Sequence, residues 1–181
     1  YPTKNIEDLF EQFPNGFTVS QMRVVDDTNV FVYLEAREKG KLLVGTIKQL
    51  NSKTKEEEKS IPFQYVDGQF VFENEEEAKK LWPQGKFVFQ ELQLNKDMLA
   101  KAKLVNKNYT KKEESSTGDN TFYLKYNIQL PVVSRILGID ESQPVELFIF
   151  GRDESDGFVY EIGTEQENQT TLWEMIREIR K

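Results

Sequence analysis

The clearest structural signal in this chain is the stretch IPFQYVDGQFVF, residues 61–72. Bulky side chains alternate with smaller or polar ones on both sides of Asp67-Gly68, and an Asp-Gly pair readily adopts the positive φ angles of a two-residue turn. The stretch therefore predicts two strands, 61–66 and 69–72, that pair as a hairpin. Hairpins between consecutive strands are typical of an antiparallel sheet.

The residues before this hairpin predict a short helix followed by a three-stranded meander. Apolar side chains recur at helical spacing over residues 6–13, and Pro14-Asn15-Gly16 stops that helix. The apolar spacing then changes to two, which predicts strands over 17–25, 30–37 and 42–50. The polar run 51–60 is expected to be a loop or a strand extension into solvent.

The residues after the hairpin predict helices inserted between further strands. In order, we expect a helix over 73–82, a strand over 86–94, a short helix from Asn95 to 104, a strand over 121–129, a helix ending at Gly138, strands over 145–151 and 158–163, and an amphipathic helix from about 170. Trp82 and Trp173 follow helical apolar spacing, so both are expected to pack in the core, without a binding role.

These elements predict the α+β class, because hairpins alternate with helices and the strand-helix-strand winding of a parallel sheet is missing. The 181 residues suit a single domain, 1–181, large enough to bury a core without a disulfide or metal. The polar, turn-rich segment 106–120 is expected to be a loop or a join between two sub-lobes.

The composition excludes several classes of catalytic and metal site, because the chain contains no histidine and no cysteine. These absences exclude a Ser-His-Asp triad, a Cys-His pair, a structural zinc site and a thiol switch within the chain. No glycine-rich phosphate loop or dinucleotide fingerprint is present either. We therefore expect no cofactor, no metal and no catalytic residue.

The charge limits the partners that the chain can attract. The formal net charge is −7, from 24 basic and 31 acidic residues, which opposes nucleic acids and anionic lipid headgroups. A basic or neutral protein is the expected partner, and we expect a monomer in its absence. No signal peptide or membrane-spanning stretch is apparent, and a chain that begins at Tyr1 without Met is expected to have lost an upstream signal or anchor.

Acidic residues in predicted strands are the candidate partner-binding residues. Glu35, Glu91, Glu146 and Glu161 are expected on one rigid sheet face, with Asp153, Glu154 and Asp156 at a nearby rim. A calcium loop at 153–157 is disfavoured because the spaced ligands are missing, and a hairpin turn explains the segment. Two of these carboxylates could also serve a glycan hydrolase, although acidic residues on a solvent-facing sheet are expected without catalysis.

Several segments resemble one known family. The opening YPTKNIEDLF, then IPF with GQFV, GKFVF, YLKY and VELF, occur in an order similar to that of the staphylococcal tandem lipoproteins. That family in turn resembles the TipC-type immunity proteins of streptococci, which are anchored on the outer face of the membrane and neutralise LXG toxins exported by type VII secretion. The resemblance implies a curved antiparallel sheet packed on helices, with an exposed acidic concave face for the toxin.

The leading hypothesis is therefore a non-enzymatic immunity protein that covers a toxin with carboxylates on its sheet face. It would act on the extracellular side of the cell membrane. The alternative is a surface lipoprotein of the tandem-lipoprotein type that serves as an interaction module without a toxin partner.

Overall fold

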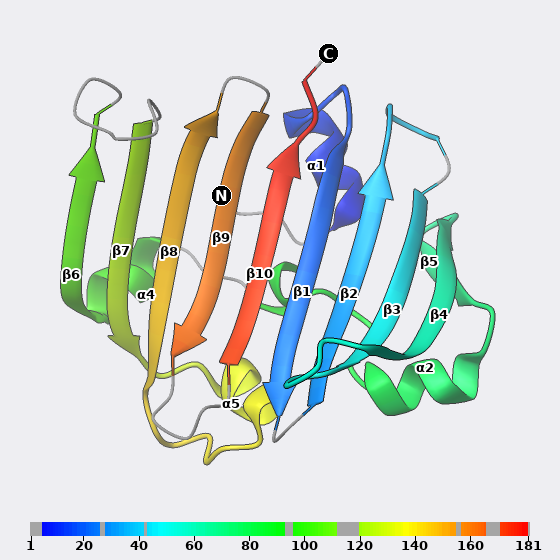
Figure 1. Cartoon of the computed structure of the whole chain (residues 1–181). Helices are drawn as coiled ribbons and strands as arrows, with labels where there is room; N and C mark the ends of the chain where they lie inside the picture. The colour runs from blue at the N-terminus through cyan, green and yellow to red at the C-terminus, as the bar shows by residue number, and fades with distance from the viewer. Residues whose placement is uncertain are drawn as a thin grey trace.

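The computed structural model describes residues 5–25, 28–41, 43–92, 96–111, 120–154, 157–165 and 171–180. Over these residues, the strands form one 10-stranded sheet with the order β5-β4-β3-β2-β1-β10-β9-β8-β7-β6. Every strand pairs antiparallel with its neighbours. The sheet remains open, with β5 and β6 at its two edges (Figure 1). The predicted α+β fold with an antiparallel sheet is confirmed.

The first half of the chain runs from the middle of the sheet to one edge, and the second half runs from the other edge back to the middle. The first half supplies α1 (Ile6–Gln12), β1 (Phe17–Val25), β2 (Thr28–Ala36), β3 (Leu43–Asn51), β4 (Glu57–Val66), β5 (Gln69–Phe72) and α2 (Glu75–Leu81). The second half supplies α3 (Val88–Glu91), α4 (Lys96–Lys101), β6 (Lys103–Thr110), β7 (Asn120–Ile128), α5 (Pro131–Leu137), β8 (Val145–Glu154), β9 (Gly157–Glu165) and β10 (Thr171–Glu178). The pairing of β1 with β10 joins the two halves.

The hairpin predicted from residues 61–72 is present with the expected turn. Val66 pairs with Gln69, and Asp67 and Gly68 both have positive φ angles, 51° and 78°. These angles fit a turn whose twist matches that of the flanking strands. The short helix ending at Gly138 is also confirmed, since Gly138 closes α5 in the left-handed conformation.

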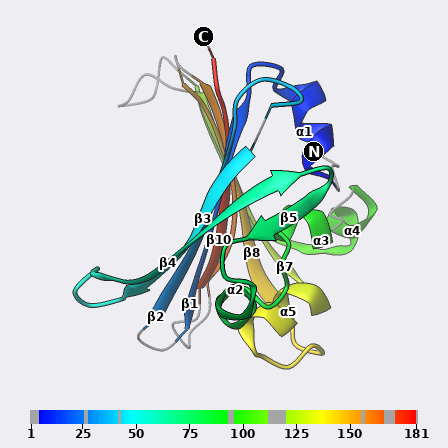
Figure 2. The same cartoon turned by 90° about the vertical axis from the view of Figure 1, so that its right-hand side faces the viewer.

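The helices all lie on one side of the sheet in the described part of the chain. Figure 2, turned by 90°, shows them together on one side, while the strands face solvent on the other. We call this second side the bare face. The end of the β3–β4 hairpin projects from the sheet on that side (Figure 2), next to a bulge between Gln49 and Leu50.

The core lies between the sheet and the helices in two clusters. The first lies around β1–β5, α1 and α2, and includes Phe17, Leu34, Phe63, Trp82 and Phe87. The second lies under α5 against β7–β10 and includes Val133, Leu147 and Leu172. The prediction that Trp82 is a core residue is confirmed, since it is 3% exposed and its ring contacts Phe63 and Phe70.

The predicted C-terminal helix is wrong, because residues 171–178 form the strand β10 in the middle of the sheet. Leu172, Glu174 and Ile176 point to the helical side and are buried, while Trp173 lies on the bare face. Leu172 and Ile176 are four apart, and the residue between them at strand spacing is a glutamate. The sequence therefore displays helical spacing where the side-chain burial has a period of two.

The predicted strand over 86–94 is also wrong, because residues 88–91 form the one-turn helix α3. Phe87, Val88 and Phe89 are all buried, which a strand with one solvent face does not allow. Side chains of the sheet hold this segment: Gln21 accepts the N–H of Val88 at 2.9 Å, and Glu174 accepts that of Phe89 at 3.0 Å. The backbone groups are satisfied without a neighbouring strand.

The polar segment expected to be a loop is partly a strand. Residues 103–110 form the edge strand β6, so the predicted short helix ends at Lys101 rather than at 104. Residues 112–119 and Asn95 lie outside the described residues. In the run 51–60, β4 begins at Glu57, which agrees with the expected strand extension.

Candidate functional site

The bare face carries a continuous band of aromatic and methionine side chains. The register of the strands places Met22 of β1 between Trp173 of β10 and Phe31 of β2. All members of the band are half-buried although none of the described helices covers them. The band, named here the aromatic band, consists of Tyr123, Phe148, Phe150, Trp173, Met175, Met22, Phe31 and Tyr33.

Contacts within the sheet hold several of these side chains in place. Tyr123 and Phe148 stack with ring centroids 6.1 Å apart at an interplanar angle of 16°. The ring of Phe148 lies over Gly163, where any Cβ atom would collide with it. The indole N–H of Trp173 donates to Glu161 at 3.4 Å. A side chain held in one place loses little conformational entropy when a partner binds.

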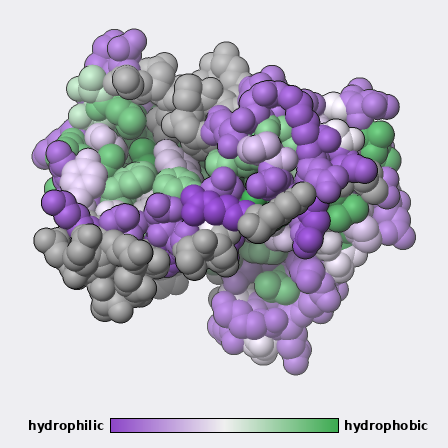
Figure 3. Space-filling model, turned by 90° about the horizontal axis from the view of Figure 1, so that it is seen from above, coloured by the Kyte–Doolittle hydropathy of each residue, from purple (hydrophilic) through white to green (hydrophobic). Residues whose placement is uncertain are grey.

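Three exposed valines on the bare face continue the apolar surface towards the β5 edge of the sheet. Val44, Val66 and Val71 are 48%, 39% and 54% exposed, and Gln64 lies between Val44 and Val71 in the register. Seen from above, hydrophilic residues cover most of the surface and hydrophobic residues appear only in patches (Figure 3). An apolar band on a surface of this kind is typical of a binding site.

The predicted partner-binding carboxylates only partly share a face. Glu35 of β2, Glu146 and Glu154 of β8 and Glu161 of β9 all lie on the bare face. Asp153 points to the opposite face, since its neighbours Arg152 and Glu154 belong to the bare one. Asp156 lies outside the described residues.

Glu91 was expected in a strand and instead lies on α3, at the helical side of the sheet. Burial raises the pKa of its carboxyl group, and Lys86 and Arg135 oppose that rise. The other predicted carboxylates that the structure describes are on strands, so Glu91 is the one that the misassigned element removes from the sheet.

Cations of the same chain already neutralise most of the carboxylates on the bare face. Arg37 pairs with Glu35 at 2.6 Å, and Lys125 pairs with Glu146 at 3.3 Å. Both Arg177, at 2.6 Å, and Arg152 pair with Glu154. The face is therefore mixed in charge rather than acidic, and a cationic partner would have to replace internal ion pairs.

The expected rim is paired in the same way. Arg180 contacts Asp153 at 3.2 Å and Glu178 at 3.0 Å, and its guanidinium also donates to the carbonyl of Glu154. These pairs raise the pKa of Arg180, against the effect of desolvation. The arginines fix the strand ends of β8 and β10 to each other.

Two further groups with a raised pKa lie on opposite sides of the sheet, Glu174 in the core and Tyr33 on the bare face. Burial raises the pKa of Glu174 to about 8, while the N–H groups of Phe89 and Val88 act in the opposite direction. Glu174 is 2% exposed and belongs to the core, next to a cavity of about 10 Å³. On the bare face, burial and the neighbouring Glu35 raise the pKa of Tyr33. A glycosidase requires two carboxylates flanking a sugar, one with a raised pKa.

An open hollow lies on the helical side of the sheet, between α1 and the turn of the β4–β5 hairpin. Its volume is about 630 Å³, and Glu7, Asp8, Glu11 and Asp67 line part of it. Tyr65 donates its hydroxyl proton to Glu7 across this hollow, and burial followed by that bond raises the pKa of Tyr65. Among the described residues, no cluster of three or more ligands suits a metal ion.

In comparisons with known proteins, no family model and no curated protein matches the chain. Over the described residues, none of the helices combines the length and apolar character needed to cross a membrane.

Sequence reasoning missed the aromatic band. Trp173 and Met175 were assigned to a helix, and their place on the bare face follows only from the pairing of β10 with β1 and β9. A usable signal was present in the strands that were predicted correctly. Phe31 and Tyr33 alternate with buried valine and leucine, so both faces of β2 carry large apolar side chains.

Proposed function

We propose that this protein is a non-catalytic immunity protein that binds and neutralises an antibacterial toxin, of the LXG class secreted by type VII systems, with the bare face of its sheet. The aromatic band carries this proposal. Aromatic residues, methionine and arginine are enriched at the centres of protein interfaces, where they bury much area at low entropic cost.

The proposed contact has an apolar centre and a charged rim. The aromatic band would supply the buried centre, and the pairs Glu35–Arg37, Lys125–Glu146 and Arg177–Glu154 surround it. Mixed charges at a rim guide association and fix orientation, whereas the centre sets the rate of dissociation. Toxin neutralisation then needs only coverage of the toxin surface.

The resemblance in sequence adds the toxin class and the place of action to this proposal. Short segments such as IPF and GKFVF are similar to those of the tandem lipoproteins, and through them to TipC-type immunity proteins. We propose accordingly that the protein acts while anchored at the outer face of the cell membrane, where it would meet an incoming toxin.

Binding to purified LXG toxin domains tests the proposal directly. Phe31→Ala and Trp173→Ala should each weaken binding by about tenfold to a hundredfold, the range for central interface residues. Tyr109→Ala is a matched control, because Tyr109 is an exposed aromatic residue of β6 outside the aromatic band. Thermal melts of all variants separate lost binding from lost folding.

Protection of growth decides between the two functions considered. Co-expression of this protein with a cognate LXG toxin should restore growth, and the band variants should restore less. If no toxin of the producing strain is bound and none is neutralised, the alternative of a surface lipoprotein without a toxin partner is favoured.

A further inference from the structure

The strand β4 has a free outer edge beyond the end of β5. β4 runs from Glu57 to Val66, but β5 pairs only with Phe63–Val66 of it. The N–H of Glu73, which follows β5, adds one more bond to the carbonyl of Pro62 at 3.1 Å. From residue 60 towards the start of β4, the ladder has no partner strand in the described part of the chain.

The backbone of Ser60 points to this free edge. In an antiparallel strand the N–H and C=O groups of one residue point to the same side, and alternate residues point to opposite sides. The carbonyl of Pro62 points outwards to Glu73, so the N–H and C=O of Ser60 point outwards too. Exposed groups of this kind accept an added strand from another chain.

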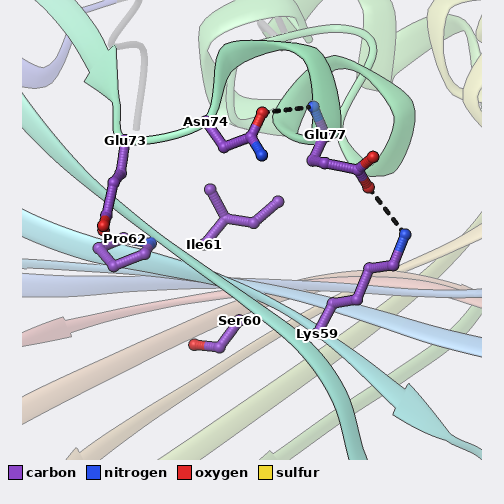
Figure 4. Close-up of a pocket in the computed structure, with 7 residues that line it drawn as sticks. All are labelled: Lys59, Ser60, Ile61, Pro62, Glu73, Asn74 and Glu77. Carbon is purple, nitrogen blue, oxygen red and sulfur yellow. Dashed lines mark hydrogen bonds and ion pairs between the residues drawn. The ribbon is translucent and has the colours of Figure 1, made fainter.

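A groove of about 620 Å³ lies beside this edge. Figure 4 shows Lys59, Ser60, Ile61 and Pro62 of β4 on one side, and Asn74, which caps α2, with Glu77 of α2 on the other. The side chain of Asn74 accepts the N–H of Glu77 at 3.2 Å and fixes the start of α2. The groove continues the line of β5, and its volume is in the range of pockets that hold short ligands.

The walls of the groove favour a cationic occupant. Glu77 pairs with Lys59 at 2.7 Å, and bonds from Lys59 and Lys80 lower the pKa of Glu77. Glu73 also lines the groove, and no cation of the described residues lies within ion-pair distance of its carboxylate. Its charge is therefore left for a partner, in a protein whose net charge is −7.

We infer that an extended, lysine- or arginine-bearing segment of the partner adds to β4 as a further strand in this groove, with its backbone on Ser60 and a cation on Glu73. The inference rests on the proposed binding function and adds a second contact to it. Strand addition of this kind gives affinity through main-chain bonds and specificity through the side chains on alternate positions.

A peptide probe tests the groove without the toxin. The probe is an octapeptide that alternates lysine and threonine, and the controls are its glutamate counterpart and an N-methylated form that cannot pair as a strand. The lysine peptide should shift the amide resonance of Ser60 and slow its hydrogen exchange, whereas both controls leave it unchanged. Equal effects of all three peptides, or none, would overturn the inference.

Two variants on neighbouring positions sharpen this test. Glu73→Lys should weaken peptide binding by about tenfold, the effect of a lost charge-assisted contact. Glu76→Lys makes the same charge change on α2 without lining the groove, so it should leave binding unchanged. If the two variants weakened peptide binding equally, the effect would be due to the net charge of the protein, and the proposed site would be rejected.

Toxin binding by the same variants separates the two proposals. If Glu73→Lys keeps full affinity for a toxin that Trp173→Ala no longer binds, the groove inference fails and the proposed function stands. If the lysine peptide binds at Ser60 and no toxin binds, the proposed toxin function fails. Sedimentation of the protein alone must show a monomer, because filling of the groove by a second copy would also overturn the inference.

Discussion

At the scale of single residues, a buried glutamate connects the middle of the sheet to the segment that covers it. Glu174 of β10 accepts the N–H of Phe89, and Gln21, beside it in the register, accepts that of Val88. Removing a carboxyl group from water costs free energy, and here the hydrogen bonds to otherwise unpaired backbone N–H groups offset that cost. Here those groups belong to α3, which crosses between the two core clusters.

The buried Glu174 predicts a pH dependence of stability. Its pKa of about 8 in the folded state lies above the ordinary glutamate value of 4.5, so the folded state binds the proton more tightly. The stabilisation is complete below about pH 4.5 and is lost as the pH rises through 8, by on the order of 5 kcal/mol. Urea unfolding across this pH window measures the loss.

Glu174→Gln keeps an oxygen acceptor for Phe89 and removes the charge, so its stability should change little between pH 5 and pH 9. Glu178→Gln is the matched control, because Glu178 lies on the same face of β10 and pairs with Arg180 near the surface. A wild-type slope that persists in Glu174→Gln would contradict the assignment.

Gly163 predicts a steric effect on the aromatic band. Gly163→Ala should destabilise the protein by about 1–3 kcal/mol, because the new methyl group meets the ring of Phe148. In a Phe148→Ala background the same change should be almost neutral. Chemical denaturation of the four proteins gives the coupling, and additive effects would mean that the ring does not cause the cost.

At the scale of elements, the two edges of the sheet are treated differently. At one edge, the short strand β5 covers part of β4, and α2 lies across the groove from the remainder. At the other edge, β6 is an exposed strand of eight residues, with Leu104, Val105 and Tyr109 47%, 50% and 58% exposed. Lysines on an edge strand hinder the pairing of two copies. β6 carries Lys103 and Lys107, and the ammonium group of Lys107 lies 5.1 Å from the ring centroid of Tyr109.

Replacing these lysines should therefore promote self-association. The double variant Lys103→Val and Lys107→Val is expected to form concentration-dependent dimers or larger species, because the edge then presents an unprotected apolar strand. Sedimentation velocity at several protein concentrations measures this. The control is the double variant Lys39→Val and Lys41→Val, in the loop between β2 and β3. It removes the same two charges away from a sheet edge and should show the same association state as the wild type.

At the scale of the whole molecule, one pairing unites the chain. The first strand, β1, lies beside the last, β10, so the two core clusters share a continuous sheet (Figure 1). This contact joins residues that are far apart in the sequence. Contacts of this kind reduce the rate of folding, because a long loop must close before they form. The segment 106–120, expected as a loop or a join between two sub-lobes, begins in the edge strand β6 and continues into 112–119, which lie outside the described residues.

The continuous sheet predicts a single cooperative unfolding transition. Trp82 reports on the first cluster, and Trp173 reports on β10 in the middle of the sheet. In the single-tryptophan variants Trp173→Phe and Trp82→Phe, fluorescence should follow the same urea curve after correction for each variant's stability. Two separate midpoints in the wild type, observed by fluorescence and circular dichroism, would show that the halves unfold independently.

The sequence by itself determined several of the local elements. Asp67-Gly68 fixed the β4–β5 hairpin, Gly138 ended α5, and clean alternation in 121–129 set the two faces of β7. It also determined the fold class and the absence of histidine and cysteine chemistry. These features follow from the φ angles and side-chain periods of neighbouring residues, which need no tertiary contact to be recognised.

Only the tertiary structure decided the identity of β10, the course of residues 86–94 and the composition of the bare face. Burial of Glu174 against the N–H of Phe89 hid the strand pattern of β10, and the same bond shaped α3. The aromatic band likewise exists only because strands far apart in the chain lie in register. A short segment contains its own periodicity, but the side chains that lie beside it depend on pairing across the sheet.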